Sequence, residues 1–526
     1  MYQDQVRRWL LTALGFLFVI YFFVERFPGA YNPISPGLDP SWRYGLNYLN
    51  HTDQIFGRDV VFTYGPLGYL LNAVNIRSNL LQALAFRLFL HAVLTTVLLY
   101  YLLRRQRVAP VMLFVFAYWI GANAGIGFTE NEYEYSFVAA TCLLTCLSYF
   151  EDSKAGLAAD ILNGFLAALF LFMKLTLGIS AMSVIAVSLL VRVIRRNSAA
   201  WKHVYATVAP YAVTIVVVKL VYLKTPGNMF LWLKRSVDIT EGFSSAMSIV
   251  GSTDLLNQAI IAMAVYLCLV LYLIIRKSPS LHIALALAVG LFFSFKLGFV
   301  RQDGHMMFFY PFLIFAVGIV LLNSQDSREL KICTIGLAIV TGLSIPVAKK
   351  FDLVSKARFD EIVSASPGIR NMKSLQNLSD TRIELDRESR NNLKDEQLPP
   401  DWLSLMKSNN STVTSIPWEW GFCAINEINC VPFRTLQMYG AYKSSLDVWS
   451  AEQFAGANAP DFLLMDFSGV DRRNQLLDTP ATWRSIFQNY EIARGKPQGL
   501  QLLKKKHSAT VKMLNEIGKV KIDVDL

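Results

Sequence analysis

About eleven apolar segments, each close to the length that crosses a lipid bilayer, occupy the first 350 residues of this 526-residue chain. A membrane-spanning helix needs about 20 largely apolar residues, because the bilayer interior cannot hydrogen-bond an exposed backbone. We expect spans at residues 9–25, 80–103, 108–127, 135–150, 157–173, 178–195, 204–223, 254–275, 281–298, 306–323 and 330–347. No small-residue cleavage site follows the first segment, so we expect an uncleaved span there rather than a signal peptide.

The composition changes beyond residue 350. Only 17% of the chain is charged, compared with about 25% in soluble proteins. The shortfall lies in residues 1–350, whereas residues 351–526 have an ordinary soluble composition. In the second part, the run Phe462–Met465 is typical of a strand, and Thr479-Pro480 should open a helix over residues 481–490. We therefore predict an α-helical polytopic membrane domain over 1–350 and a soluble α/β domain over 351–526.

Basic residues predict how the spans are oriented. They cluster at residues 7–8, 104–107, 192–202, 276–277 and 328–331. All five clusters fall on one face if every span crosses once, and the positive-inside rule makes that face cytoplasmic. We expect an integral protein of a bacterial inner membrane, with a cytoplasmic N-terminus and an extracytoplasmic C-terminal domain. In such an oxidising compartment Cys423 and Cys430 could form a disulfide, a pairing that the sequence leaves open.

The formal net charge of +11 is explained by this topology, so no nucleic-acid partner is expected. The sequence contains no zinc-ligand spacing, no phosphate-binding P-loop and no dinucleotide fingerprint.

The first outer loop carries Asp39, followed by Pro40. This pair is typical of a helix N-cap and a first helical position. Trp42, Leu46 and Leu49 share one face of the predicted helix, which should lie flat in the membrane interface. Asp39 has two compatible interpretations. It could only cap the helix, or it could also be a general base, because a cap fixes the carboxylate as a base requires.

Two further acidic features lie in outer loops. Arg58 and Asp59 belong to a turn-rich run after the first predicted helix, and we expect them near the substrate. Glu130 and Glu132 belong to the loop between the third and fourth spans. They could bind a divalent metal such as Mg²⁺ or Mn²⁺ through carboxylate oxygens, or simply form a solvated acidic loop.

Cationic residues also gather on the predicted outer face. Lys174 interrupts an apolar run, where it could anchor the turn at the interface or bind an anionic lipid headgroup. Lys234 and Arg235 are better explained as interface anchors than as substrate ligands.

The stretch from Lys296 to His305 contains Arg301 and Asp303 as well. Positive charge on an outer turn opposes the orientation rule, so this stretch favours a phosphate site in which Asp303 orients Arg301 or His305. The alternative is a local ion pair.

These features resemble the C-type membrane glycosyltransferases. Asp39 matches the acidic residue of their first outer loop, Glu130-Asn131-Glu132 matches a second acidic motif, and Lys174 stands where such enzymes often carry a lysine. The run Phe62–Gly68 also resembles a bacterial membrane family of this general type. The first loop lacks the paired acids of the best-known subfamilies, so metal dependence does not follow from the resemblance.

The resemblance implies an enzyme, a glycosyltransferase of the cell envelope that is expected to invert the anomeric centre. It would transfer a sugar from a polyprenyl-phosphate donor to a glycan, lipid or protein acceptor on the outer face. Asp39 would be the catalytic base, and Lys174, Lys296, Arg301 and His305 would bind the donor phosphate.

Three other functions stay open. A flippase or transporter for a lipid-linked sugar would be expected to show inverted repeats and charges in mid-membrane, and the sequence shows neither. A polysaccharide polymerase or ligase usually has its large outer loop between spans. A scaffold without enzymatic activity leaves the residues from Lys296 to His305 unexplained.

Overall fold

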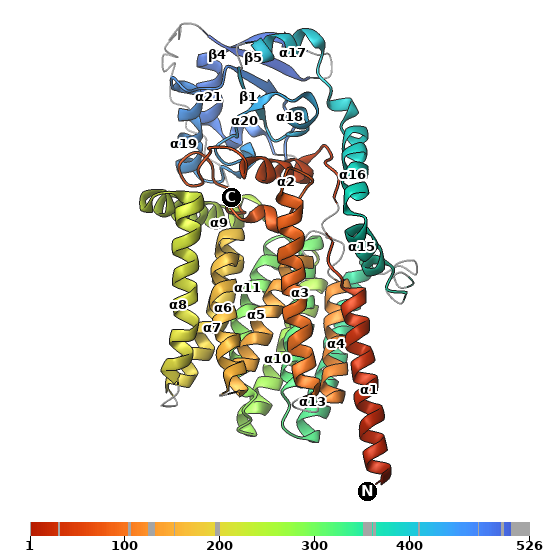
Figure 1. Cartoon of the computed structure of the whole chain (residues 1–526). Coiled ribbons are helices and arrows are strands. Elements are labelled where there is room, and N and C mark those ends of the chain that lie inside the picture. Colours follow the sequence, from red (N-terminus) through yellow and green to blue (C-terminus); the bar gives the residue numbers. More distant parts are fainter. Residues whose placement is uncertain are drawn as a thin grey trace, which may run out of the picture. The chain divides into compact units, whose positions relative to one another are not determined.

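The structure is a computed structural model, and the chain is traced in Figure 1. It describes residues 2–29, 32–103, 107–124, 132–151, 153–194, 200–350, 360, 364–408, 411–471, 473–495 and 499–506.

The chain forms two compact units. One comprises residues 1–34 and 43–392, and we call it the helical unit; the other comprises residues 35–42 and 393–526, and we call it the sheet unit. The division along the chain therefore falls after Asn392 rather than at the predicted residue 350. In addition, a short piece of the first predicted outer loop belongs to the sheet unit.

The helical unit consists of long helices joined by short connections. They are α1 (Tyr2–Glu25), α3 (Asn79–Leu103), α4 (Val108–Ala124), α5 (Glu132–Phe150), α6 (Lys154–Met173), α7 (Leu175–Ile194), α8 (Ala200–Val218), α9 (Pro226–Ala246), α10 (Thr253–Ile275), α11 (Leu281–Val300), α12 (Phe309–Leu322), α13 (Ser327–Lys350), α15 (Ser366–Gln376) and α16 (Leu378–Asn392). A single π-helical turn, Lys219–Leu223, extends α8, and a 3-10 turn, η3 (Gly304–Phe308), precedes α12.

Within the described residues, eight helices are long and apolar enough to cross a membrane. Shorter apolar helices cover Trp9–Glu25, Val108–Ile120 and Val138–Phe150. Together these helices coincide with the eleven segments predicted from the sequence. The helices are consistent with an integral membrane protein, while the number of crossings and the orientation of the termini stay predictions.

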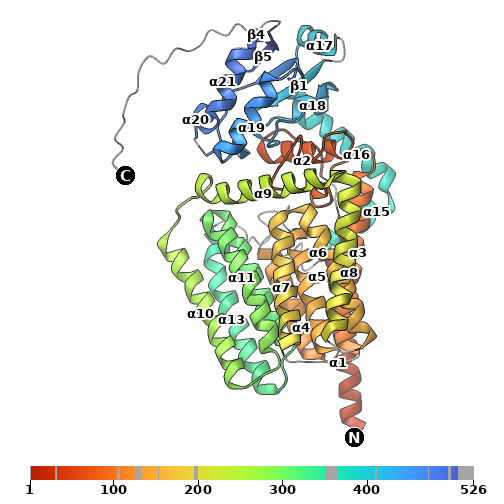
Figure 2. The same cartoon turned by 90° about the vertical axis from the view of Figure 1, so that its left-hand side faces the viewer.

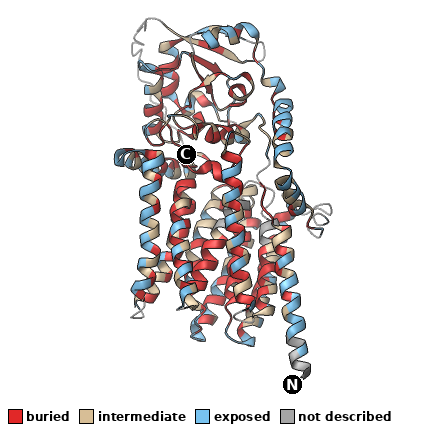
Figure 3. Cartoon of the chain, viewed as in Figure 1, coloured by how far each residue is buried: buried red, intermediate tan, exposed pale blue. Residues whose placement is uncertain are grey.

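Burial within the bundle follows the pattern of a membrane protein. Every residue of α12 is buried, so this helix forms the centre of the bundle. Large apolar side chains of the peripheral helices α8 and α10 are exposed, among them Val213, Leu220, Leu271 and Ile275. Figure 3 shows these exposed outer faces beside buried inner ones. An apolar surface of this extent fits contact with lipid.

Helix α9 differs from its neighbours in direction. Figures 1 and 2 both show it lying across one end of the bundle rather than along it. Its sequence begins with Thr225 and Pro226, and the Thr225 side chain caps the Asn228 backbone N–H at 3.2 Å. This segment, which carries Lys234 and Arg235, is therefore a helix with a defined start, and it contacts the loops that carry the candidate site.

The sheet unit contains a five-stranded sheet in the order β2-β1-β3-β5-β4. Its strands are β1 (Thr412–Ile416), β2 (Asn429–Cys430), β3 (Phe462–Met465), β4 (Tyr490–Gly495) and β5 (Gln501–Lys505). Strand β1 pairs in parallel with β2 and β3, whereas β5 pairs antiparallel with β3 and β4. Val413 is in register with Phe462, and Leu463 with Leu503.

Helices complete the sheet unit, namely α17 (Pro400–Lys407), α18 (Gly421–Asn426), α19 (Ser444–Ala455), α20 (Gln475–Asp478) and α21 (Pro480–Asn489). Residues from β1, β3, α19 and α21 share one core, which includes Ile416, Leu463, Phe454, Trp483 and Ile486. The strand at 462–465 and the helix opened by Pro480 are therefore confirmed.

A disulfide joins Cys423 in α18 to Cys430 in β2, with the two Cα atoms 6.1 Å apart. The pairing that the sequence left open is therefore present in the structure.

Candidate functional site

Lys174 occupies a break between α6 and α7. Its backbone is extended, and its side chain is buried. Lys174 pairs with Tyr64 in an isolated antiparallel bridge, and its Nζ lies 4.9 Å from the centre of the Tyr64 ring. The buried ammonium is thus held against an aromatic face, a favourable cation–π arrangement.

The loop that carries Tyr64 is hydrogen-bonded to the end of α6. The Gly65 and Leu67 backbone N–H groups donate to the carbonyls of Met173 and Phe172, at 2.9 and 3.0 Å. A Cβ atom at Gly65 would lie 2.4 Å from the Phe172 carbonyl oxygen, so only glycine permits this approach. The run Phe62–Gly68 therefore has a structural role in placing Lys174.

Arg301, Asp303 and His305 form one ionic cluster at the turn between α11 and η3. Arg301 Nε and Nη2 both lie 3.2 Å from Asp303 Oδ2. On the other side, His305 Nδ1 lies 2.6 Å from Asp303 Oδ1, and the His305 backbone N–H donates to the same oxygen at 2.9 Å. Asp303 thus contacts both residues that it was predicted to orient.

The charge state of Asp303 follows from these contacts. Burial acts to raise the pKa of the Asp303 carboxyl group. The hydrogen bonds from His305 and the charges of His305 and Arg301 outweigh burial and hold this pKa well below its usual range. Asp303 is therefore ionised at neutral pH.

Lys174 and the Arg301 cluster lie near different parts of α9. Trp232 stacks on Phe172, whose ring centroid is 5.2 Å away, whereas the Met247 carbonyl that ends α9 is 3.5 Å from Arg301 Nη1. The fifteen residues from Trp232 to Met247 span about 22 Å along a helix. The two regions therefore contact different turns of α9, and a phosphate site shared by Lys174, Lys296, Arg301 and His305 stays a prediction.

The other predicted cations differ in their surroundings. Lys296 and Lys234 have exposed side chains. Arg235 donates from Nη1 to the Gly57 carbonyl, which joins α9 to the first outer loop. Arg58 pairs with Asp59 through two bonds of 2.8 and 2.7 Å.

Asp59 also accepts the Ile55 backbone N–H at 2.9 Å. The Arg58–Asp59 pair therefore closes a turn, which is a structural role. A role near the substrate stays a prediction.

Asp39 does not cap its helix. Helix α2 (Leu38–Leu49) begins one residue earlier, and the Ser41 backbone N–H donates to the Gly37 carbonyl at 3.1 Å. Gly37 therefore takes the capping position, with a φ of +108° that favours glycine. The prediction of Asp39 as the N-cap was wrong by two residues, because the chain bends at Gly37 rather than at Asp39.

The Asp39 carboxylate nevertheless has the features of a held and accessible base. It is exposed, and Trp42 Nε1 donates to its Oδ1 at 3.0 Å. Its Oδ2 accepts no hydrogen bond from any described residue. Asp39 belongs to the sheet unit, whereas Lys174, Arg301 and His305 belong to the helical unit.

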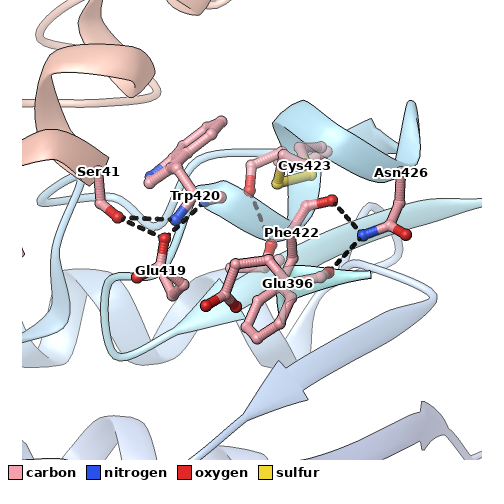
Figure 4. The surroundings of a disulfide bond; sticks show 11 residues. Ser41, Glu396, Glu419, Trp420, Phe422, Cys423 and Asn426 are labelled. Atoms are coloured by element: carbon pink, nitrogen blue, oxygen red, sulfur yellow. Dashed lines mark hydrogen bonds between the residues drawn. A yellow bond between two sulfur atoms is a disulfide. The ribbon is translucent and has the colours of Figure 1, made fainter. Parts of the chain in front are cut away.

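The start of α2 is fastened to the sheet unit by a residue that the sequence did not single out. Glu419 follows β1 and is buried, and its carboxylate accepts hydrogen bonds from Gly37, Ser41 and Gly421. Figure 4 shows Ser41, Glu419 and Trp420 converging beside the disulfide. In the sequence, Glu419 is marked only by being an acidic residue that follows a strand. That pattern is too common to single out a functional position.

The candidate metal ligands Glu130 and Glu132 lie outside what the structure describes. Residue 130 is not described, and only the backbone of Glu132, at the start of α5, is. Among the described residues, no group of three or more His, Cys, Asp or Glu side chains could hold a metal ion.

Comparison with known proteins adds no relative. The sequence matches no family model, and no curated protein is significantly similar to it.

Proposed function

We propose that the protein is a membrane glycosyltransferase of the C-type class, which transfers a sugar from a polyprenyl-phosphate donor to an envelope acceptor outside the cytoplasm. The observation that carries the proposal is the cluster of Arg301, Asp303 and His305. A guanidinium and an imidazole held together at the end of a helix as apolar as α11 fit a lipid-borne phosphate, because the lipid tail would lie along the bundle and the phosphate at its rim.

Asp303 makes this cluster suitable for reversible binding of a phosphate. Its single carboxylate holds the side chains of Arg301 and His305 in place. Arginine has five N–H donors in a planar fork. Such a fork matches the oxygens of a phosphate group, which suits Arg301 to bind the donor phosphate.

In the proposed reaction, Asp39 Oδ2 accepts the proton of an acceptor hydroxyl group while Oδ1 stays bonded to Trp42. The acceptor oxygen forms a bond to the anomeric carbon, and the bond from that carbon to the donor phosphate oxygen breaks. The electron pair leaves with the phosphate, where hydrogen bonds from Arg301 and His305 stabilise the new negative charge. Attack in line with the leaving group inverts the anomeric centre.

Lys174 is assigned a second anionic contact in this proposal, because its region contacts another turn of α9 than Arg301 does. A donor with a diphosphate or an extended sugar chain would reach both regions, with Lys174 binding the more distant anionic or polar group. The disulfide between Cys423 and Cys430 supports an oxidising location for the sheet unit.

The proposal is tested by mass spectrometry of envelope glycans and lipids. Cells that lack the gene are compared with the same cells carrying it on a plasmid. We expect one or more glycoconjugates to lack a single sugar residue in the deletion strain and to regain it on complementation. Unchanged sugar composition with altered chain length would favour a polymerase or ligase instead. Accumulation of an intact lipid-linked donor on the cytoplasmic face would favour a flippase.

A further inference from the structure

We infer that Glu419 is a positioning residue, which holds the first turn of α2, and with it the Asp39 carboxylate, in place on the sheet unit. The catalytic consequence of this restraint rests on the function proposed above. The restraint itself follows from contacts within the sheet unit alone.

Glu419 contacts the chain on both sides of Asp39. Its Oε2 accepts the Gly37 backbone N–H at 2.7 Å, and its Oε1 accepts the Ser41 hydroxyl at 2.8 Å. Ser41 Oγ in turn accepts the Trp420 backbone N–H at 3.1 Å, so this hydroxyl is used as both donor and acceptor. One buried carboxylate therefore fixes two residues that lie two positions before and two positions after Asp39.

A second contact restrains the residue next to Asp39. Gln437 Nε2 donates to the Leu38 carbonyl at 2.6 Å, and Gln437 is fully buried. Three of the four neighbours nearest to Asp39 in the sequence are thus hydrogen-bonded to segments that flank the sheet. Such multiple restraint is what a catalytic group requires, because small displacements of the group reduce the rate.

The Glu419 carboxylate is well anchored itself. It follows β1, and the Gly421 backbone N–H at the start of α18 donates to its Oε1 at 2.7 Å. The disulfide from Cys423 to Cys430 then ties α18 to β2. Figure 4 shows this arrangement, in which Asn426 also joins α18 to the Glu396 carbonyl at 2.9 Å.

All three partners of the Glu419 carboxylate donate hydrogen bonds to it. An ionised carboxylate only accepts hydrogen bonds, whereas a glutamine amide has one accepting oxygen and one donating nitrogen. In Glu419→Gln the nitrogen would face either Gly37 N–H or the pair of Ser41 and Gly421. This nearly isosteric change therefore removes at least one restraint without opening a cavity.

The sheet unit offers a matched control in Asp447. This carboxylate is also buried, and it accepts the backbone N–H groups of Ala481 and Thr482, both at 2.9 Å. Asp447 thus holds the start of α21 as Glu419 holds the start of α2, but it has no contact with α2. Asp447→Asn reproduces the chemical change at a helix that carries no proposed catalytic group.

The first test is hydrogen–deuterium exchange of the full-length protein in lipid nanodiscs. In Glu419→Gln, we expect the backbone N–H groups of residues 37–42 to exchange about tenfold faster, because a buried hydrogen-bonding partner is lost. In Asp447→Asn, faster exchange should appear near residues 480–484 and not in α2. Unchanged exchange of residues 37–42 in Glu419→Gln would overturn the inference.

The second test measures Asp39 directly. A water-soluble carbodiimide and an amine label exposed carboxylates, and mass spectrometry gives the rate at Asp39 in each variant. We expect Glu419→Gln and Ser41→Ala to change this rate at least threefold, and Ser41→Thr, which keeps the hydroxyl, to restore it towards the original value. Equal labelling rates in all these variants would show that Glu419 and Ser41 do not position the Asp39 carboxylate.

The same variants are then compared for product in complemented cells by mass spectrometry. We expect Glu419→Gln to lose about tenfold or more of the transferred sugar and Asp447→Asn to retain it. If Asp39 labelling changes and Asp39→Asn abolishes product, but Glu419→Gln makes full product, the positioning role is wrong. If Asp39→Asn itself makes full product, the proposed function is wrong. The exchange and labelling results still show whether Glu419 holds the first turn of α2 in place.

Discussion

At the scale of single residues, the proposed chemistry depends on the two oxygens of Asp39. One oxygen accepts a hydrogen bond from the buried Trp42 indole, and the other is accessible. A carboxylate held in this way keeps one lone pair directed at an incoming hydroxyl group. The Trp42 bond should therefore matter for the orientation of the base rather than for its charge.

Asp39→Asn should abolish sugar transfer while leaving donor binding largely intact, because the amide cannot accept the acceptor proton. General-base catalysis contributes about 10²–10⁴-fold in rate, and a loss of that size is expected. The measurement is the amount of glycosylated product in complemented cells, with protein abundance in the membrane fraction as the control. Full product with Asp39→Asn would show that Asp39 is not the catalytic base.

Arg301→Ala should reduce transfer about a hundredfold or more, because a charged donor to the leaving phosphate is lost. Lys331→Ala is the control, since it removes a positive charge from an exposed position in α13 that has no part in the proposed site. We expect the control to change transfer only slightly. Equal losses in the two variants would indicate that overall positive charge, rather than the Arg301 cluster, is what matters.

Burial raises the pKa of the Glu419 carboxyl group above its ordinary value of 4.5, although hydrogen bonds from Gly37, Gly421 and Ser41 oppose the rise. A carboxyl group with a raised folded-state pKa binds protons more tightly in the folded state. Its contribution to stability is therefore complete below about pH 4.5 and is lost as the pH rises through the raised pKa.

We therefore expect the free energy of local unfolding around β1 and α18 to fall across this pH window in the wild-type protein. Glu419→Gln should lack this component, since an amide does not titrate. Hydrogen–deuterium exchange of the full-length protein at several pH values measures the difference. The same pH dependence in both proteins would assign the effect to other groups.

At the scale of elements, α6 and α8 show how tightly the bundle packs. A Cβ atom at Gly164 in α6 would lie 2.0 Å from the Thr207 carbonyl oxygen in α8. In membranes, small residues allow helix backbones to approach each other closely. The buried Asp160 carboxylate and His203 ring, 2.5 Å apart, lie in the same interface.

Gly164→Ala should therefore destabilise the bundle, because a rigid backbone atom would have to move. Gly342→Ala in α13 is the control, since no atom lies within 4 Å of the added Cβ. The thermal midpoint of the detergent-solubilised protein should fall for Gly164→Ala and stay constant or rise slightly for Gly342→Ala. Equal midpoints would show that α6 and α8 can separate without cost.

The sequence predicted elements better than it predicted their contacts. Long apolar runs such as residues 281–298 fix the helices, because every backbone group in a bilayer must be hydrogen-bonded within its own helix. The contact of Asp303 with Arg301 and His305 was also foreseen, since these residues are neighbours in the chain. Local chemistry was therefore enough wherever the interacting groups were close in sequence.

Contacts between distant segments could not be predicted in this way. Glu419 lies far along the chain from Gly37 and Ser41, and no periodicity or motif links the two regions. The cap of α2 was misplaced for a related reason, because the bend at Gly37 depends on a bond that Glu419 supplies.

At the scale of the whole molecule, the proposed reaction needs residues from both compact units. The sheet unit provides Asp39 through residues 35–42, and the helical unit provides Arg301, His305 and Lys174. The sheet unit thus acquires a role in the proposed chemistry, since it would hold the base at the start of α2. Catalysis then requires the two units to bring Asp39 and the cationic cluster to one substrate.

Cross-linking between the units tests this requirement most directly. Asp39→Cys is combined with His305→Cys in a full-length protein in which the exposed Cys268 is replaced by serine, and the pair is treated with a short bismaleimide. Glu491→Cys with Lys504→Cys, which are register partners in β4 and β5, is the positive control. We expect Asp39→Cys and His305→Cys to cross-link, and to do so faster in membranes that contain lipid-linked sugar. Efficient cross-linking of the control pair, with none between Asp39→Cys and His305→Cys, would contradict the requirement that Asp39 and His305 act on one substrate.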